Sequence, residues 1–213
     1  MPALPPLTPN PTRYPGSCLS LSTTLLHTIT TQLTTTHIKS PSSNPLLLSI
    51  GSGTGLLEEL LHTHLTQTQT PTPIPNTKSH SWRCEGVELP SVNKHLPEDR
   101  INTVRGTWAL HPRADDAAAL LFVYPRESGL VARYLERYMR DPAHLDNEER
   151  GQAESRGLES SKVQLVIWIG PRTDYVSDYA QLFASISDFE VEVREGVGID
   201  EYETFVVLRR RDK

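Results

Sequence analysis

Short apolar runs alternate along the chain with segments in which apolar residues recur at helical spacing. Residues 46–50 form an apolar run of the length that is buried in a parallel sheet, and leucines between 56 and 61 follow one face of a helix. The same alternation continues in the second half, with apolar runs at 117–127 and 162–170 and helical periods at 130–139 and 175–186. The pattern predicts an α/β fold of three layers around a mostly parallel sheet.

The last two apolar segments follow one another directly. Residues 189–194 alternate apolar and charged side chains, which is typical of a half-exposed strand, and residues 204–208 form a final apolar strand. A short polar connection joins them, so they are expected to pair antiparallel. The C-terminal strand is therefore predicted to lie antiparallel, at or near an edge of the sheet.

Segments rich in small polar residues and proline set the organisation of the chain. Residues 1–43 are rich in Ser, Thr and Pro, but apolar residues between 19 and 33 recur at helical spacing and predict a helix ahead of the first strand. Residues 66–81 are Thr- and Pro-rich and predict a loop insertion, and the polar segment 141–161 predicts a second surface loop. The expected organisation is an N-terminal segment, 1–43, followed by one domain, 44–213.

Three alternating glycines follow the first apolar run, at Gly51, Gly53 and Gly55. Glycine allows a sharp turn and lets a ligand approach the backbone, and the amides of the following helix point at that ligand. Dinucleotide-binding turns have the spacing G-x-G-x-x-G, whereas Leu56 occupies the position of that third glycine here. A nicotinamide-dependent oxidoreductase is therefore disfavoured. The turn instead resembles motif I of the class I S-adenosylmethionine-dependent methyltransferases.

This resemblance covers about residues 44–213 and implies a Rossmann-like methyltransferase fold with S-adenosyl-L-methionine as cofactor. It implies that Glu88, at the end of the second strand, accepts hydrogen bonds from both ribose hydroxyls, as a carboxylate can. It implies that the adenine lies near Thr107, with Trp108 stacking on it. The cofactor-binding residues that it implies are Ser49, Gly51, Ser52, Gly53, Gly55, Glu88, Leu89, Thr107, Trp108 and Tyr124.

Two positions depart from the family pattern. Ser49 stands where the family usually has an acid that helps to orient the methionine end of the cofactor, and Thr107 stands where it often has Asp. The main expectation is methyl transfer to a small-molecule acceptor. The alternative is a methyltransferase-like protein that has lost catalysis and serves as a binding or scaffold subunit, which both departures favour.

The sequence does not identify a catalytic residue. Methyl transfer is an in-line displacement that positioning alone can accelerate, so a base is optional. If the acceptor is a hydroxyl, the candidate bases are His111, Tyr124 and Glu127. No metal is expected, because His62 and His64 have the wrong spacing for a pair on one helix face.

Composition limits the partners and the cellular location that the sequence predicts. The formal net charge is −5, and no basic stripe with interleaved aromatic residues occurs, so nucleic acid is not favoured as a partner. Cys18 and Cys84 are too few for a disulfide framework and fit a reducing compartment. Because no apolar stretch approaches the length of about 20 residues that spans a membrane, a cytoplasmic location is expected, with the nucleus as an alternative. The sequence leaves the oligomeric state open.

Overall fold

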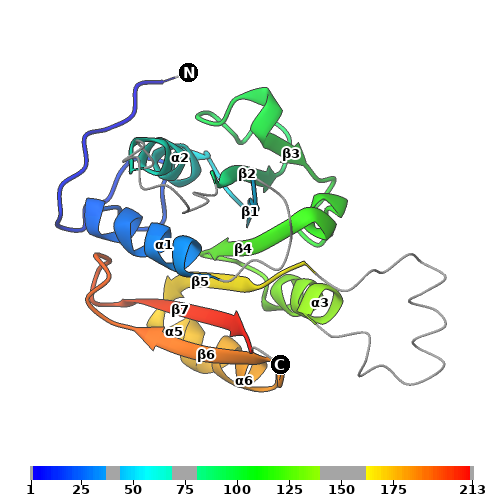
Figure 1. The fold of residues 1–213 in the computed structure, drawn as a ribbon. Helices are drawn as coiled ribbons and strands as arrows, with labels where there is room; N and C mark the ends of the chain where they lie inside the picture. Colours follow the sequence, from blue (N-terminus) through cyan, green and yellow to red (C-terminus); the bar gives the residue numbers. More distant parts are fainter. Residues whose placement is uncertain (1, 37–43, 69–80, 140–161, 212–213) are drawn as a thin grey trace, which may run out of the picture.

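A computed structural model describes residues 2–36, 44–68, 81–139 and 162–211 of the chain. In these ranges seven strands form one sheet in the order β3-β2-β1-β4-β5-β7-β6 (Figure 1). The strands are β1 Leu46–Ile50, β2 Arg83–Glu88, β3 Ile101–Thr103, β4 Ala117–Val123, β5 Leu165–Pro171, β6 Phe189–Arg194 and β7 Glu203–Arg210. Strands β1 to β5 pair parallel, whereas β7 pairs antiparallel with both β5 and β6. The predicted mostly parallel sheet with an antiparallel C-terminal strand is confirmed.

Helices cover both faces of the sheet. One face carries α1 Thr23–Thr35 and α2 Leu56–Thr68, and the other carries α3 Ser128–Met139 and a second helical stretch (Figure 1). That stretch joins α5 Arg172–Asp174, a π-helical turn at Tyr175–Tyr179 and α6 Ala180–Ala184. Short 3₁₀ turns at Glu98–Arg100 and Pro112–Asp116 precede β3 and β4. The predicted three-layer arrangement is confirmed.

The central strands are buried on both faces, which explains why their sequences are unbroken apolar runs. All five residues of β1 are buried. Leu47 packs in the cluster beneath α1 and α2, while its neighbours Leu46 and Leu48 pack in the cluster beneath α3 and α6. A strand with two buried faces needs apolar side chains on both, so it shows no alternation.

The helix predicted in the N-terminal segment is present as α1. It begins at the N-cap Ser22, whose hydroxyl oxygen accepts a hydrogen bond from the Leu25 amide at 2.9 Å. Its buried face, which includes Leu25 and Ile29, packs in the same cluster as the first face of the sheet. Upstream, Thr12 and Leu21 form an antiparallel bridge. The N-terminal segment therefore belongs to the core that supports the sheet.

The predicted loops overlap only partly with the described residues. Helix α2 continues to Thr68, so the first residues of the predicted loop 66–81 are helical, and residues 69–80 lie outside the described residues. The predicted loop 141–161 lies wholly outside the described residues. Across the described ranges, no helix combines the length and the apolar composition that a membrane crossing requires.

Candidate functional site

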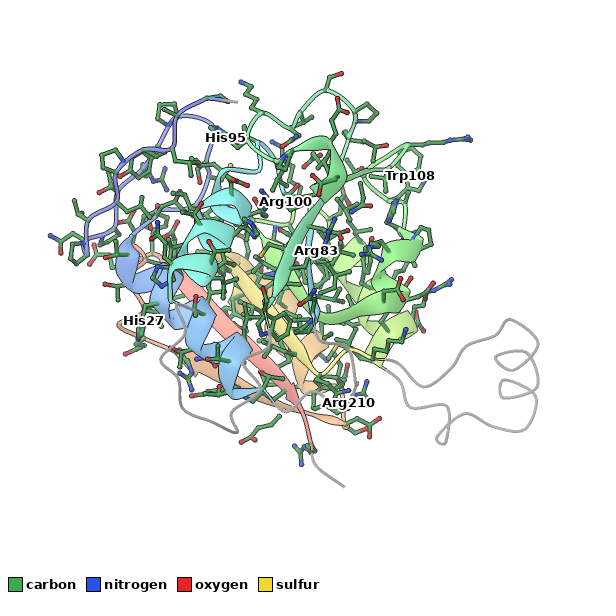
Figure 2. All side chains as sticks on the ribbon, turned by 45° about the horizontal axis from the view of Figure 1, so that its top comes forward. His27, Arg83, His95, Arg100, Trp108 and Arg210 are labelled. Atoms are coloured by element: carbon green, nitrogen blue, oxygen red, sulfur yellow. The ribbon has the colours of Figure 1, made fainter. Side chains whose placement is uncertain are left out.

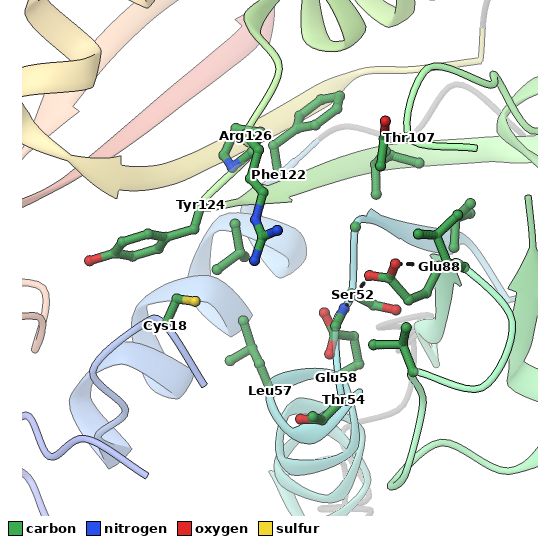
Figure 3. A pocket seen from close by; sticks show the side chains of 18 of the residues that line it. Cys18, Ser52, Thr54, Leu57, Glu58, Glu88, Thr107, Phe122, Tyr124 and Arg126 are labelled. Carbon is green, nitrogen blue, oxygen red and sulfur yellow. Dashed lines mark hydrogen bonds between the residues drawn. The ribbon is translucent and has the colours of Figure 1, made fainter. Parts of the chain in front are cut away.

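A cavity of about 340 Å³ lies at the carboxyl ends of β1, β2 and β4 (Figure 3). The order of the strands reverses at β1. Strands β2 and β3 follow it on one side of the sheet, and β4 and β5 lie on its other side. Open parallel α/β sheets bind ligands at such a switch point. The volume lies in the range of about 300–1,000 Å³ that is typical of small-ligand pockets. The fold therefore places a ligand-sized cavity directly over the glycine turn.

The three glycines of the turn have different roles. Gly51, Gly53 and Gly55 all adopt the left-handed conformation, with φ of 75°, 56° and 76°. A Cβ atom at Gly51 or Gly53 would meet nothing within 4 Å, and Gly53 and Gly51 both line the cavity. A Cβ atom at Gly55 would lie 2.6 Å from the Asn93 Oδ1 atom, and Gly55 does not line the cavity. The first two glycines leave open space above the turn, and the third allows close packing against Asn93.

Glu88 joins the glycine turn to β2 and faces the cavity. The Gly53 amide donates to Glu88 Oε2 at 2.7 Å, and the Leu89 amide donates to Glu88 Oε1 at 2.8 Å (Figure 3). Each carboxylate oxygen has two lone pairs, so both can still accept a hydroxyl proton. Glu88 is thus fixed in place by the backbone and keeps the capacity to bind a diol.

Ser49 lies beneath the cavity and bonds to a buried acid that lines it. The Ser49 hydroxyl donates to Glu58 Oε1 at 2.6 Å, and Ser49 itself does not line the cavity. Glu58, in the first turn of α2, is 2% exposed and does line it. Burial raises the pKa of Glu58 to about 7, the Ser49 bond opposes that rise, and the charge of Glu88 adds to it.

Glu58 is absent from the site residues expected from sequence, although a signal for it exists. It lies three residues before Leu61 and seven before Leu65, so it shares their helix face. Leu61 and Leu65 are buried in the core beneath α1 and α2. The sequence signal is therefore an acid on the buried face of the helix that follows the glycine turn.

The residues expected near an adenine separate into two groups. Leu89 and Thr107 line the cavity, as does Ser52. Trp108 does not, and its side chain is 66% exposed at the periphery of the molecule (Figure 2). Its ring lies over Gly106, where an added Cβ atom would come within 2.6 Å of the ring. The structure therefore does not bring Trp108 to the other expected site residues.

The three candidate bases also have different surroundings. Tyr124 lines the cavity, but its phenol donates to Glu203 Oε1 at 2.7 Å, and burial together with that carboxylate raises its pKa further above its ordinary range. His111 lies outside the cavity lining, where its Nδ1 atom accepts from the Arg113 amide at 3.2 Å as an N-cap. Glu127 lines the cavity with an exposed side chain. Of the three candidate bases, Tyr124 and Glu127 line the cavity and His111 does not.

The N-terminal segment forms one wall of the cavity. Residues 16–19 line it, and the Thr54 hydroxyl of the glycine turn donates to the Gly16 carbonyl at 3.2 Å. Glu203, at the start of β7, accepts hydrogen bonds from the amide and the hydroxyl of Ser20 as well as from Tyr124. One buried carboxylate thus joins the N-terminal wall to the end of β4.

Comparison with known proteins identifies the fold. The sequence matches no family model and no curated protein. The structure is similar to a candidate class I S-adenosylmethionine-dependent methyltransferase from Listeria monocytogenes, with 12% identity and a TM-score of 0.51, covering 89% of this chain and 60% of that one. It is also similar to precorrin-6y C5,15-methyltransferase from Geobacter metallireducens, with 7% identity and a TM-score of 0.50, covering 94% of each chain. The fold expected from the glycine turn is confirmed.

The expectation that nucleic acid is not favoured as a partner is wrong. The similar structures include the 23S rRNA methyltransferase ErmE, with 14% identity and a TM-score of 0.47, covering 92% of this chain and 71% of that one. The net charge of −5 is summed over the whole chain, whereas contacts to phosphates depend on basic side chains near the site. The charge balance therefore does not exclude RNA.

Proposed function

We propose that this chain, which has the fold of the class I S-adenosylmethionine-dependent methyltransferases, binds S-adenosylmethionine over its glycine turn and transfers the methyl group to an acceptor. The observation that carries the proposal is the pairing of Glu88 with the Gly53 amide at 2.7 Å, at the mouth of a ligand-sized cavity. This pairing sets a diol-binding carboxylate beside a backbone that a ligand can approach closely.

The residues of the cavity fit the parts of this cofactor. Glu88 would accept the ribose hydroxyls, and the open space over Gly51 and Gly53 would admit the chain that joins the ribose to the amino-acid end. Leu89 and Thr107 would flank the adenine. When bound, the cofactor supplies a methyl group on a positively charged sulfur.

The acceptor would enter beside the end of β4, where Tyr124 and Glu127 line the cavity. A small-molecule acceptor is the proposal that the N-terminal wall favours, because residues 16–19 cover one side of the cavity. A lone pair of the acceptor would form the bond to the methyl carbon, and the electron pair of the broken carbon–sulfur bond would stay on sulfur. Glu127, which lines the cavity, would take the proton that an oxygen acceptor releases.

One observation favours a second candidate, a binding or scaffold protein without catalysis. Both carboxylate oxygens of Glu88 already accept backbone hydrogen bonds, so the turn is held in place by the chain itself. Under this alternative Glu88 has a structural role, and the cavity binds neither form of the cofactor.

Calorimetric titration with S-adenosylmethionine, S-adenosylhomocysteine and NAD separates these functions. Binding of both S-adenosyl compounds without binding of NAD is the expected result. Transfer of a labelled methyl group into a small-molecule extract or into RNA then identifies the class of acceptor. If neither S-adenosyl compound gives a heat of binding, the proposed methyl transfer is overturned and the scaffold function takes its place.

The contact of Glu88 with the ribose gives a direct test. Glu88→Ala is expected to weaken binding of S-adenosylhomocysteine at least about tenfold, because a hydrogen bond to a charged group is worth about 1.5–3 kcal/mol. The matched control is Glu98→Ala, which removes an exposed carboxylate that does not line the cavity. Calorimetry on both variants checks the result, and equal affinities would exclude Glu88 as the ribose ligand.

A further inference from the structure

Glu58 is a buried carboxylate whose hydrogen bonding is incomplete. Its Oε1 atom accepts from Ser49, but its Oε2 atom is buried and has no hydrogen-bond partner. The side chain is 2% exposed and lines the cavity on the helix side of the glycine turn, beside Ser52 (Figure 3). A buried charge without a partner is strongly unfavourable. A ligand group that donates a hydrogen bond to this atom would remove that cost.

The charges around the cavity favour a cationic ligand. Among the described residues that line it, three are acids, Glu58, Glu88 and Glu127, and one is basic, Arg126. Arg126 follows β4, and its exposed side chain extends from the β4 side into the cavity (Figure 3). Among the described residues no cation forms an ion pair with Glu58, and the charge that acts on it is that of Glu88.

We infer that Glu58 binds a primary ammonium group of the ligand through its Oε2 atom, with Ser49 as the residue that positions the carboxylate. This inference rests on the proposed function, because it assigns the amino-acid end of S-adenosylmethionine to this part of the cavity. An ammonium group carries both a charge and three donors. The sulfonium group of the same cofactor carries a charge but no N–H or O–H donor, so it cannot satisfy Oε2.

The assignment makes ligand binding depend on pH near neutrality. The titratable groups that face Glu58 are Glu88, which raises its pKa, and Cys84, a buried thiol whose own pKa is raised by burial. Because an ammonium group favours the ionised carboxylate, affinity should increase as pH rises through about 7, the pKa of Glu58. A ligand without an ammonium group should show no such increase.

Calorimetry with two related ligands tests the inference. S-adenosylhomocysteine has the ammonium group and no sulfonium charge, and 5′-methylthioadenosine has the same nucleoside without the amino-acid end. Glu58→Gln, which keeps the shape and removes the charge, is expected to weaken binding of S-adenosylhomocysteine at least about tenfold and to leave 5′-methylthioadenosine unchanged. The increase in affinity between about pH 6 and about pH 8 should disappear in the same variant.

A second variant and the melting temperature keep the test decisive. Ser49→Ala leaves the carboxylate in place without its positioning bond. It is expected to weaken the binding of S-adenosylhomocysteine by a smaller factor than Glu58→Gln does. The apo melting temperature of Glu58→Gln at about pH 8 should equal or exceed that of the wild type, because a buried charge is removed. If Glu58→Gln weakens the binding of both ligands equally, or the binding of neither, the ammonium assignment is overturned while the proposed function stands. If neither ligand binds the wild type, both are overturned.

Discussion

Gly53→Val is expected to abolish binding of S-adenosylmethionine and S-adenosylhomocysteine while the protein still folds. Gly53 lines the cavity, and a Cβ atom there would point into open space, which is the space that the ligand needs. A branched side chain would fill it. The left-handed φ of 56° adds a backbone cost of about 1–2 kcal/mol, which a domain of this size can tolerate.

Gly196→Val is the matched control for this variant. Gly196 has a φ of 66° and also has nothing within 4 Å of an added Cβ atom, but it lies between β6 and β7 and does not line the cavity. Both variants carry similar backbone strain, so only the obstruction of the cavity distinguishes them. Calorimetry and far-UV circular dichroism check the pair. Binding by folded Gly53→Val with the affinity of the wild type would show that the ligand does not lie over this turn.

Glu85→Ala is expected to destabilise the fold by about 1.5–3 kcal/mol, the worth of hydrogen bonds to a charged group, because the partners that remain, Arg113 and Arg83, are 35% and 44% exposed. The Glu85 side chain is 3% exposed and accepts two bonds from Arg113, at 2.8 and 2.9 Å. It also accepts from Arg83 at 2.7 Å and from Asn102 at 3.1 Å, so it ties β2 to β3 and to the turn before β4. Urea unfolding measures the loss.

Asp116→Ala is the control, because Asp116 also pairs with Arg113 but its side chain is 55% exposed. Such a surface pair is worth about 0–1 kcal/mol. Burial would raise the pKa of Glu85, but the bonds from Arg113, Asn102 and Arg83 outweigh it and lower the pKa to about 2. The stabilisation is therefore complete above the unfolded value of about 4.5 and is lost as pH falls toward 2. Equal losses in the two variants would contradict this account.

The fold could be predicted from sequence because its strands are buried on both faces. Unbroken apolar runs such as 46–50 mark central strands of a parallel sheet, and the adjacent strands 189–194 and 204–208 mark the antiparallel end. The π-helical turn at Tyr175–Tyr179 could not be predicted, because a single turn with one extra residue shifts the apolar period too briefly to show in the sequence pattern.

The site could be predicted where backbone geometry fixes it. Gly51, Gly53 and Glu88 meet at one edge of the sheet because parallel strands end there together. Trp108 and Glu58 depend instead on the direction of one side chain. The ring of Trp108 folds back over Gly106 and stays exposed, whereas Glu58 turns inward with the leucines of its helix face. Neither direction follows from the spacing of the motif alone.

The bonds between Ser20 and Glu203 have a consequence for the order of folding. They join residues 183 positions apart, and the wall that they hold in place completes the cavity. Contacts of such long sequence separation form late, because their loop-closure entropy is lost before the contact can compensate for it. The chain should therefore complete its cavity only after β7 has joined the sheet, because Glu203 is the first residue of that strand.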